Sequence, residues 1–314
     1  MDRVISLAAL ALLRVLHALP LRAVARLGRA AGLAAYLLDF RHRRVAVRNL
    51  TRCFSAEKSP AEIRALAREN FQRIGENFAC ATKTAVMTLE ELRPHVEFVA
   101  PQLDIPPGGG PRRLIAAIGH FGNFELYARL GQFASAYQCA TTYRALRQPA
   151  LNRIFQSLRE RSGCHFFERR TGADELKAFM NHPGVLLGLL ADQAGSDKSP
   201  LLPFLGTDCA TSLAPALLAL RYDCELVVGI CYRTGLARWR IEGSGEIPLR
   251  ENGHPRDPEQ IMRDVNRAFE VAVRRDPANW FWVHDRWKPR RPRRAGRHVR
   301  AFSPPAAPGA ASSD

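Results

Sequence analysis

Between residues 114 and 232, short apolar runs alternate with segments whose apolar residues recur at helical spacing. Strands that alternate with helices favour parallel pairing, because each helix returns the chain to the same end of the sheet before the next strand begins. We therefore expect an α/β fold, a sandwich with a largely parallel central sheet flanked by helices. The expected strands are 114–118, 139–143, 164–167, 185–191 and 225–232, and the expected helices between them are 123–134, 149–163, 172–184 and 212–223.

The sequence on either side of this region is organised differently. Residues 1 to about 90 and residues 257–277 have apolar residues at helical spacing, and a further strand is expected at 238–243. The Pro-, Arg- and Ala-rich sequence beyond residue 289 predicts a disordered tail, an end that need not pack. We expect a membrane-associated helical segment (1–40), a main domain (41–288) and a basic tail (289–314).

The net charge of +16 is concentrated at the two ends of the chain. Residues 1–52 carry ten arginines against two acidic residues, residues 286–300 carry eight Lys or Arg and no acidic residue, and the body between them is nearly neutral. A nucleic-acid-binding protein more often carries a basic stripe with interleaved aromatic residues on its folded body. Basic ends beside apolar sequence favour an anionic membrane surface, with nucleic-acid binding through the arginine-rich ends as the minor alternative.

The N-terminal segment is apolar but interrupted. Residues 4–13 form an apolar run, which Arg14, His17 and Pro20 then break, whereas a bilayer-spanning helix needs about 20 predominantly apolar residues. Arginines continue beyond a poor cleavage site, so the pattern of a signal peptide is weak. We expect an uncleaved helix that lies in, or dips through, the cytoplasmic face of a membrane; an ordinary amphipathic helix covering the core is the alternative.

The seven cysteines are odd in number and include no C-x-x-C pair. This pattern argues against a disulfide framework and a zinc ribbon, and it predicts buried thiols in a reducing, cytosolic environment. Several histidines have no partner at metal-ligand spacing, so we expect no metal. They are His165, His182, His254 and His284.

The sequence IGHFGNFEL (118–126) places His120 directly after an expected strand and Glu125 in the first turn of the following helix, with Asn123 as its expected N-cap. On either side of such a turn the two side chains can meet. A carboxylate that holds an imidazole in one tautomer leaves the other ring nitrogen to take a proton from a hydroxyl. The pattern predicts a general-base dyad, although an H-x-x-x-x-E spacing by itself is a weak signal.

Further motifs make the signal specific. They are GHFGNFE (119–125), TYRALRQPALNRIFQSLRERSG (142–163), ADQ (191–193), PFLG (203–206), TSLAPALLA (211–219) and WFWVHDRWK (280–288). In this order they resemble the bacterial lipid A biosynthesis acyltransferase family, the late lauroyl and myristoyl transferases, with which the phosphatidylinositol mannoside acyltransferases are grouped. The resemblance covers roughly residues 1–290 and implies a glycerolphosphate-acyltransferase-like fold.

The resemblance also implies roles for individual residues. His120 resembles the family's catalytic base and Glu125 its dyad partner, while Asp192 of the ADQ motif is expected to shape the site. The expected substrate-binding residues, for phosphate, carbonyl or oxyanion groups, are Asn123, Arg144, Arg159, Arg170 and Asp192. For two of these the structural alternatives stay open: Asp192 capping a turn, and Arg159 lying on a solvated helix face.

The C-terminal motif departs from the family once. The family ending H-R-R-W/F-K reads HDRWK here, so Asp285 stands where an arginine is expected, which puts in doubt any role of that position in binding a phosphate-rich acceptor. The tryptophans of the motif favour packing, or anchoring at a membrane interface, over chemistry. They are Trp280, Trp282 and Trp287.

The resemblance implies an O-acyltransferase at the cytoplasmic face of the inner membrane. It would move a fatty acyl chain from acyl carrier protein or coenzyme A, as co-substrate, to a hydroxyl of a membrane glycolipid, without a cofactor. A lipid A precursor is the expected acceptor; an inositol-mannoside or an aminolipid is the alternative. A basic, membrane-binding homologue without activity is the competing interpretation from another class.

Overall fold

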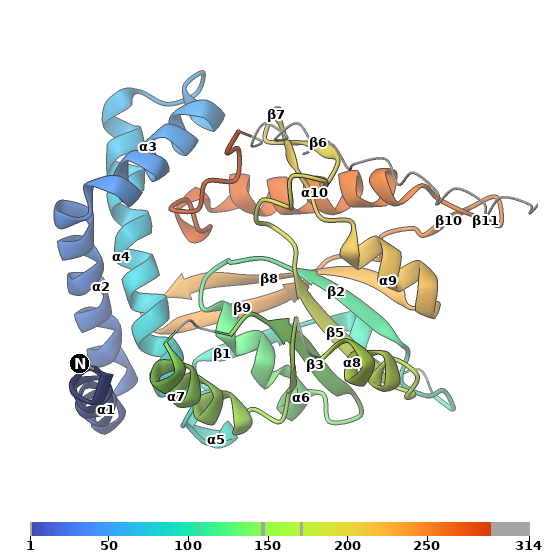
Figure 1. The fold of residues 1–314 in the computed structure, drawn as a ribbon, viewed down its shortest axis with the longest axis horizontal. Coiled ribbons are helices and arrows are strands. Elements are labelled where there is room, and N and C mark those ends of the chain that lie inside the picture. The colour runs from blue at the N-terminus through green and yellow to red at the C-terminus, as the bar shows by residue number, and fades with distance from the viewer. Residues whose placement is uncertain (1, 106, 146–147, 170–171, 290–314) are drawn as a thin grey trace, which may run out of the picture.

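The computed structural model describes residues 2–105, 107–145, 148–169 and 172–289. A seven-stranded sheet lies at its centre, with helices on both faces and a group of N-terminal helices at one end (Figure 1). The prediction of a disordered tail falls on residues 290–314, outside the described residues.

The helices are α1 (Asp2–Ala18), α2 (Leu21–Leu38), α3 (Phe40–Phe54), α4 (Pro60–Thr84), α5 (Leu89–Leu92), α6 (Leu130–Phe133), α7 (Pro149–Glu160), α8 (Ala173–Phe179), α9 (Ala214–Tyr222) and α10 (Pro258–Arg275), with the 3-10 helices η1 (Pro101–Leu103), η2 (Phe124–Arg129) and η3 (Pro277–Asn279). The strands are β1 (Val96–Val99), β2 (Leu114–Ile118), β3 (Gln138–Tyr143), β4 (His165–Glu168), β5 (Val185–Leu190), β6 (Leu201–Phe204), β7 (Thr207–Ala210), β8 (Glu225–Gly235), β9 (Arg238–Gly243), β10 (Arg250–Glu251) and β11 (His254–Pro255).

The prediction of a largely parallel central sheet is confirmed. The strand order is β1-β9-β8-β2-β5-β3-β4, and every neighbouring pair is parallel except β8 with β9. All five strands expected between residues 114 and 232 form, as do β9 and α10. The sequence did not predict β1 or the separate β6–β7 hairpin. The expected helix 123–134 is instead the short η2 followed by the single turn of α6.

The two faces of the sheet pack against different helices. Alternate residues of a strand point to opposite faces. On one face Ile115, Leu187 and Val228 belong to the core that includes residues of α9 and α10. On the other face Ala116 and Ile118 pack with residues of η2 and α6. Because β2 and β5 are parallel neighbours, their carboxyl ends meet at one edge of the sheet, and the functional site is built there.

The N-terminal helices pack through glycines. A Cβ atom on Gly32 of α2 would lie 2.2 Å from the carbonyl oxygen of Phe71, and one on Gly75 of α4 would lie 2.1 Å from that of Gly28. The two helices can approach this closely only because these positions lack side chains. The other face of α2 exposes leucines, with Leu27 at 51 %. Among the described helices, none combines the length and the apolar composition needed to cross a membrane.

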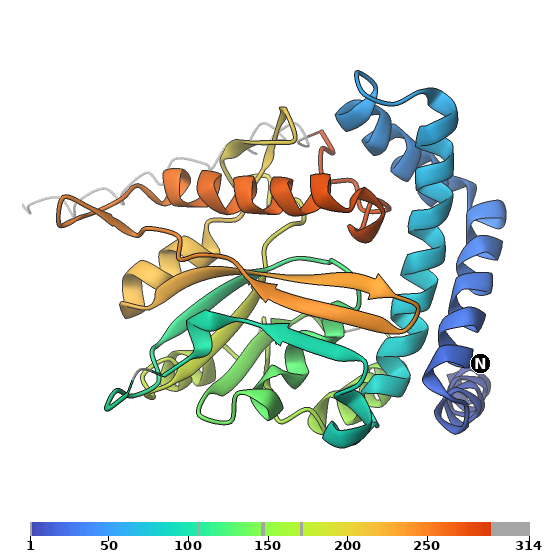
Figure 2. The ribbon, with the colours of Figure 1, turned by 180° about the vertical axis from the view of Figure 1, so that it is seen from behind.

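A buried carboxylate joins these helices to the sheet. The Glu76 side chain of α4 is fully buried and accepts hydrogen bonds from Arg29 (3.4 Å), Arg233 Nε (2.9 Å) and the Ala237 backbone (3.0 Å). Figure 2 shows the β8–β9 hairpin reaching α4. Since removing one partner of a buried ion pair leaves an uncompensated charge, at a cost of about 3–5 kcal/mol, this cluster fixes the hairpin against α4.

Candidate active site

The turn after β2 has a defined shape. Gly122 adopts a positive φ of 51°, and a Cβ atom there would lie 2.5 Å from the carbonyl oxygen of Cys231. Its backbone N–H donates to the carbonyl of Asn279. The sequence folds this way locally because only glycine fits both the backbone conformation and the close approach. The turn directs His120 toward the adjacent end of β5.

His120 forms its closest polar contacts with Asp192. The ring Nδ1 lies 2.8 Å from Asp192 Oδ1, and the His120 backbone N–H donates to Oδ2 at 2.9 Å. An ionised carboxylate can only accept hydrogen bonds, so Nδ1 carries the hydrogen and Nε2 keeps a lone pair. Burial works to raise the pKa of the Asp192 carboxyl, but the positive charge of the His120 ring in its protonated form, and hydrogen bonds from His120 and Trp280, outweigh it and hold that pKa below its usual value.

The C-terminal motif holds Asp192 and the two residues after it. Trp280 Nε1 donates to Asp192 Oδ2 at 2.8 Å, and the Ala194 backbone N–H donates to His284 Nε2 at 3.2 Å. Arg286, which is 1 % exposed, donates to the carbonyl of Gln193 and to that of Ala210. Sequence reasoning missed these roles, because the three residues lie about 90 positions from Asp192 and share no local pattern with it.

Glu125 does not form the predicted contact with the His120 ring. It pairs instead with Arg159 of α7, whose Nη2 lies 2.8 Å from Oε1 and whose Nε lies 3.3 Å from Oε2. Because the segment after Asn123 is a 3-10 helix, Glu125 points toward α7, while His120 Nδ1 meets the carboxylate at the end of the neighbouring strand. The carboxylate that orients the imidazole is that of Asp192, and this corrects the expected partner.

The structure places the other predicted site residues as follows. Arg144 follows β3 and lines the cavity, as does Arg159, whose guanidinium lies over the rings of Tyr143 and Phe166 at 5.8 and 5.1 Å. Asn123 occupies the N-cap position of η2, as expected, but its side chain makes no capping hydrogen bond and instead reaches Thr84 Oγ1 at 3.5 Å, buried behind the turn. Arg170 lies outside the described residues.

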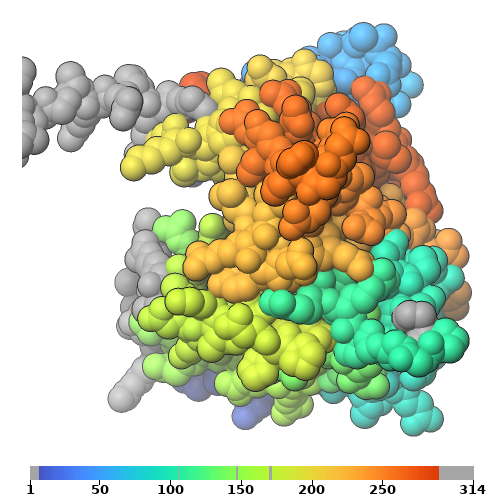
Figure 3. Space-filling model, turned by 90° about the vertical axis from the view of Figure 1, so that its right-hand side faces the viewer, coloured from blue at the N-terminus to red at the C-terminus, as the bar shows by residue number. Residues whose placement is uncertain are grey.

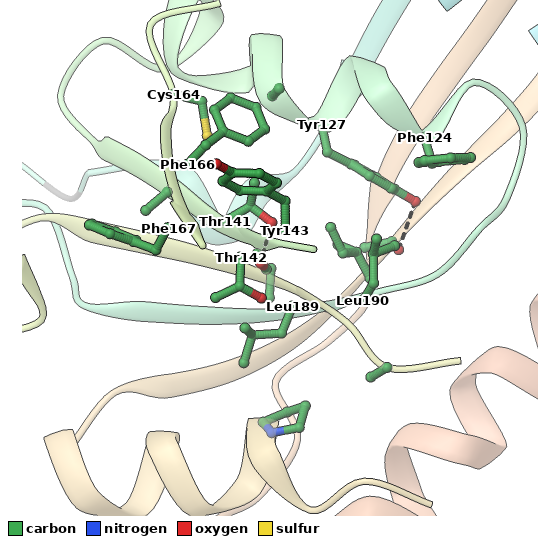
Figure 4. A pocket seen from close by; sticks show the side chains of 18 of the residues that line it. Phe124, Tyr127, Thr141, Thr142, Tyr143, Cys164, Phe166, Phe167, Leu189 and Leu190 are labelled. Atoms are coloured by element: carbon green, nitrogen blue, oxygen red, sulfur yellow. Dashed lines mark hydrogen bonds between the residues drawn. The ribbon is translucent and has the colours of Figure 1, made fainter. Parts of the chain in front are cut away.

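A cavity of about 1000 Å³ opens beside the His120 ring. Its wall includes the polar side chains of His120, Glu125 and Arg159, and most of the remaining wall is apolar. Figure 4 shows Tyr143, Phe166 and other residues of β3, β4 and β5 around it. The space-filling view shows the surface hollowed between the yellow segment of β6 and β7 and the green segments beneath it (Figure 3).

The remaining expectations for the C-terminal motif are resolved by burial. Trp280 and Trp282 are 1 % and 0 % exposed, and Trp287 is buried as well, so their packing is confirmed and a place at a membrane interface is excluded. Asp285, which stands where an arginine was expected, pairs with Arg48 of α3 at 2.7 Å. The position therefore ties the motif to the N-terminal helices.

The arrangement suits general-base chemistry on a hydroxyl. His120 presents Nε2, with Gln193 Nε2 3.3 Å away, and its Nδ1 side is fixed by a buried carboxylate. An imidazole held in this way can accept a proton and is stabilised once charged. Among the described residues, no group of three His, Cys, Asp or Glu side chains has the geometry to hold a metal ion.

Comparison with known proteins connects this geometry to a family. The sequence matches the sequence model of one protein family, bacterial lipid A biosynthesis acyltransferase, over residues 2–289. This match covers nearly all of the chain and confirms the resemblance drawn from the motifs. No curated protein matches the chain.

Proposed function

Since the chain belongs to the bacterial lipid A biosynthesis acyltransferase family, we propose that it is an O-acyltransferase in which His120 and Asp192 form the general-base pair. The observation that supports this most directly is the hydrogen bond between His120 Nδ1 and Asp192 Oδ1, with the His120 ring lining a largely apolar cavity. The family supplies the reaction class, and the cavity supplies space for a fatty acyl chain.

In the proposed reaction His120 Nε2 removes the proton from an acceptor hydroxyl. The oxygen attacks the thioester carbonyl, a C–O bond forms, and the C–S bond breaks as the tetrahedral intermediate collapses. The imidazolium then returns its proton to the departing thiolate. Asp192 keeps the correct tautomer before the reaction and stabilises the imidazolium during it.

Arg159 has the second role in this proposal. Glu125 and the two aromatic rings hold its guanidinium at the cavity wall, where it can donate to the thioester carbonyl or to a phosphate. Glu125 then acts by positioning Arg159. Arg144, which is exposed at the cavity, would contact a second anionic group of donor or acceptor.

The proposed donor is a fatty acyl thioester of acyl carrier protein or coenzyme A, and the proposed acceptor is a lipid A precursor. Both donors carry phosphate or acidic groups, which suit the arginines at the cavity. The proposed reaction uses no cofactor. We also propose that the protein works at the cytoplasmic face of the inner membrane.

The N-terminal helices support that location. Leu7, Leu10 and Leu12 of α1 are exposed, as are Leu27 and Leu37 of α2. These leucines and the arginines of the same helices suit an anionic leaflet. Phe78, on the α4 helix that α2 covers, lines the cavity, so the N-terminal helices adjoin the site through α4.

The test is an acyl-transfer assay in detergent micelles, read by mass spectrometry. Acyl carrier protein and coenzyme A thioesters would be offered against a lipid A precursor and a panel of other membrane lipids. We expect a mass gain on the precursor that is lost with His120→Ala. A gain on an inositol-mannoside or an aminolipid instead would change the acceptor but keep the mechanism.

Folded protein that transfers no acyl group to any lipid would overturn the proposed function and leave the interpretation as a membrane-binding homologue. Asp208, exposed on β7, provides the matched control. Asp208→Asn should transfer acyl groups at the wild-type rate.

A further inference from the structure

The cavity continues around the carboxyl edge of the sheet onto both faces. Five consecutive residues of β3, from Cys139 to Tyr143, line it. Because consecutive side chains of a strand point to opposite faces, one cavity wall with consecutive residues must extend over both faces. Figure 4 shows Leu189 and Thr142 on one side of the strands and Tyr143 and Phe166 on the other.

The part beneath the sheet, which we call the η2 arm, is bounded by η2 and α6. Its sheet wall crosses five neighbouring strands, β3, β5, β2, β8 and β9. Apart from Thr141, whose hydroxyl donates to the Gly188 carbonyl, the residues of this wall are small or apolar: Cys139, Leu186, Gly188, Ala116, Ile118, Val227, Gly229 and Ile241. Four interstrand distances of about 4.8 Å give the wall a width of roughly 19 Å, enough for an extended fatty acyl chain.

The part on the opposite face, which we call the α9 arm, is bounded by α8, α9 and the loop after β5. Apolar residues such as Leu189 and Leu218 line its interior. Polar side chains also line this arm, namely Gln193, Ser196, Ser212 and Thr142, and Gln193 among them contacts His120. The two arms therefore differ in chemistry: the sheet wall of the η2 arm is mostly apolar, whereas the wall of the α9 arm bears hydroxyls and an amide.

We propose that the two substrates occupy opposite faces of the sheet: the donor's fatty acyl chain lies in the η2 arm, and the sugar-bearing end of the acceptor enters through the α9 arm. This assignment rests on the proposed acyltransferase function and deepens it. Gln193 provides the link, because it lines the α9 arm and its Nε2 lies 3.3 Å from His120 Nε2. A hydroxyl arriving along that arm reaches the nitrogen that must take its proton.

Two glycines set the depth that the acyl chain can use. Gly188 and Gly229 flank Ile118 on the sheet wall, and a Cβ atom on Gly188 would meet only the Ile118 side-chain tip at 3.2 Å and the Ala140 carbonyl at 3.8 Å. A side chain there would fill the η2 arm without striking backbone at close range. Val227, one strand beyond β2, lines the same arm, so shortening it would enlarge the arm.

The experiment compares opposite changes in one arm. Gly188→Val should shift the preferred donor to shorter chains, and Val227→Ala should shift it to longer chains. Each methylene that no longer fits should lower kcat/KM about fourfold, since burying one is worth about 0.8 kcal/mol. General damage to the fold would lower all rates together and could not move the optimum in opposite directions.

The matched variant lies in the other arm. Ala214, at the start of α9, lines the α9 arm, and Ala214→Leu should raise the KM for the acceptor severalfold while keeping the wild-type donor chain-length optimum. If Ala214→Leu moved the donor optimum and Gly188→Val did not, the assignment of the arms would be reversed and the proposal overturned.

A binding measurement separates this proposal from the proposed function. Free fatty acids of increasing length would be bound to the wild type, Gly188→Val and Val227→Ala and detected by native mass spectrometry, without turnover. Shifts in the retained length would support the η2 arm even if no acyl transfer occurred, in which case the proposed function alone would fail. Active protein with the same retained length in all three would overturn the arm assignment alone.

Discussion

Asp192→Asn tests the pairing of His120 with a carboxylate from a neighbouring strand. Two N–H groups, those of the His120 backbone and of Trp280 Nε1, donate to Asp192 Oδ2. In the Asp192→Asn variant these two N–H donors keep the amide oxygen in the position of Oδ2, so the amide NH₂ group takes the position of Oδ1 and faces His120 Nδ1. An NH₂ group donates there, which forces the ring hydrogen onto Nε2 and removes the lone pair that accepts the substrate proton.

The expected loss follows from this change of tautomer. Loss of the correct tautomer in a base pair of this kind lowers kcat by on the order of 10³- to 10⁴-fold. That corresponds to about 4–5.5 kcal/mol of transition-state stabilisation. Because Asn has the size of Asp and keeps both hydrogen bonds at one oxygen, the fold should be retained.

The assay measures initial rates of acyl transfer at saturating donor, together with the ¹⁵N chemical shifts of the His120 ring, which report the tautomer. Glu125→Gln is the comparison and Asp208→Asn the control. We expect Asp192→Asn to lose nearly all kcat and to show the hydrogen on Nε2. The Glu125→Gln protein should lose less, mainly through KM, because Arg159 is then held less firmly.

The reasoning would be refuted if Asp192→Asn kept more than a tenth of the wild-type kcat, or if the ring hydrogen stayed on Nδ1. A larger loss in Glu125→Gln than in Asp192→Asn would return Glu125 to the role of dyad partner that the sequence motif suggests. It would also mean that the pair with Arg159 opens when substrate binds.

Three other changes have defined outcomes. Trp280→Phe removes one hydrogen-bond donor from the Asp192 carboxylate, which then stabilises the His120 imidazolium more strongly. The acid limb of the pH profile of kcat/KM should therefore move to higher pH by as much as about one unit. If the limb did not move, Trp280 would contribute packing alone. Burial lowers the pKa of His284, so the folded protein resists protonation of this ring, and the stability that His284 contributes falls as the pH drops below about 6.5. In urea unfolding, the free energy of unfolding of the wild type and of His284→Gln should therefore differ less at pH 5.5 than at pH 7.5. An equal difference at both pH values would contradict this. Leu27→Glu should weaken binding to anionic vesicles more than tenfold, since burying a leucine is worth about 1.5–3 kcal/mol. Val271→Glu, at an exposed position of α10, should leave vesicle binding unchanged. Equal effects of the two variants would exclude α2 as the membrane-binding face.

The strands could be predicted because their signal is local. Short apolar runs such as 114–118 and 185–191 end at glycine or a polar residue, and they form β2 and β5 with boundaries close to those expected. The segment after Asn123 was wrong in type because an apolar periodicity does not distinguish one α-helix from a 3-10 helix followed by a single turn. The β6–β7 hairpin has too few residues for a pattern to stand out.

The positions of His120 and Asp192 at strand ends could be predicted from the sequence, but not the contact between them. His120 and Asp192 were both placed at the ends of expected strands, yet nothing in the sequence gives the strand order that makes β2 and β5 neighbours. A spacing of five residues therefore favoured Glu125, the nearer carboxylate along the chain. The structure shows that adjacency in the sheet decided the partner, since the carboxyl ends of parallel neighbours meet whatever the separation in sequence.

The C-terminal motif explains why such a distant pairing is stable. At the turn after β5, Trp280 donates a hydrogen bond to Asp192, and His284 accepts one from the backbone N–H of Ala194. Arg286 donates to the carbonyl of Gln193, the residue between these two. The motif is itself held by Asn49 of α3, whose Nδ2 donates to the carbonyls of Trp282 and His284. The position of Asp192 thus depends on contacts from the N-terminal helices through the C-terminal motif, so a change at α3 should reach His120 through hydrogen bonds without any direct contact.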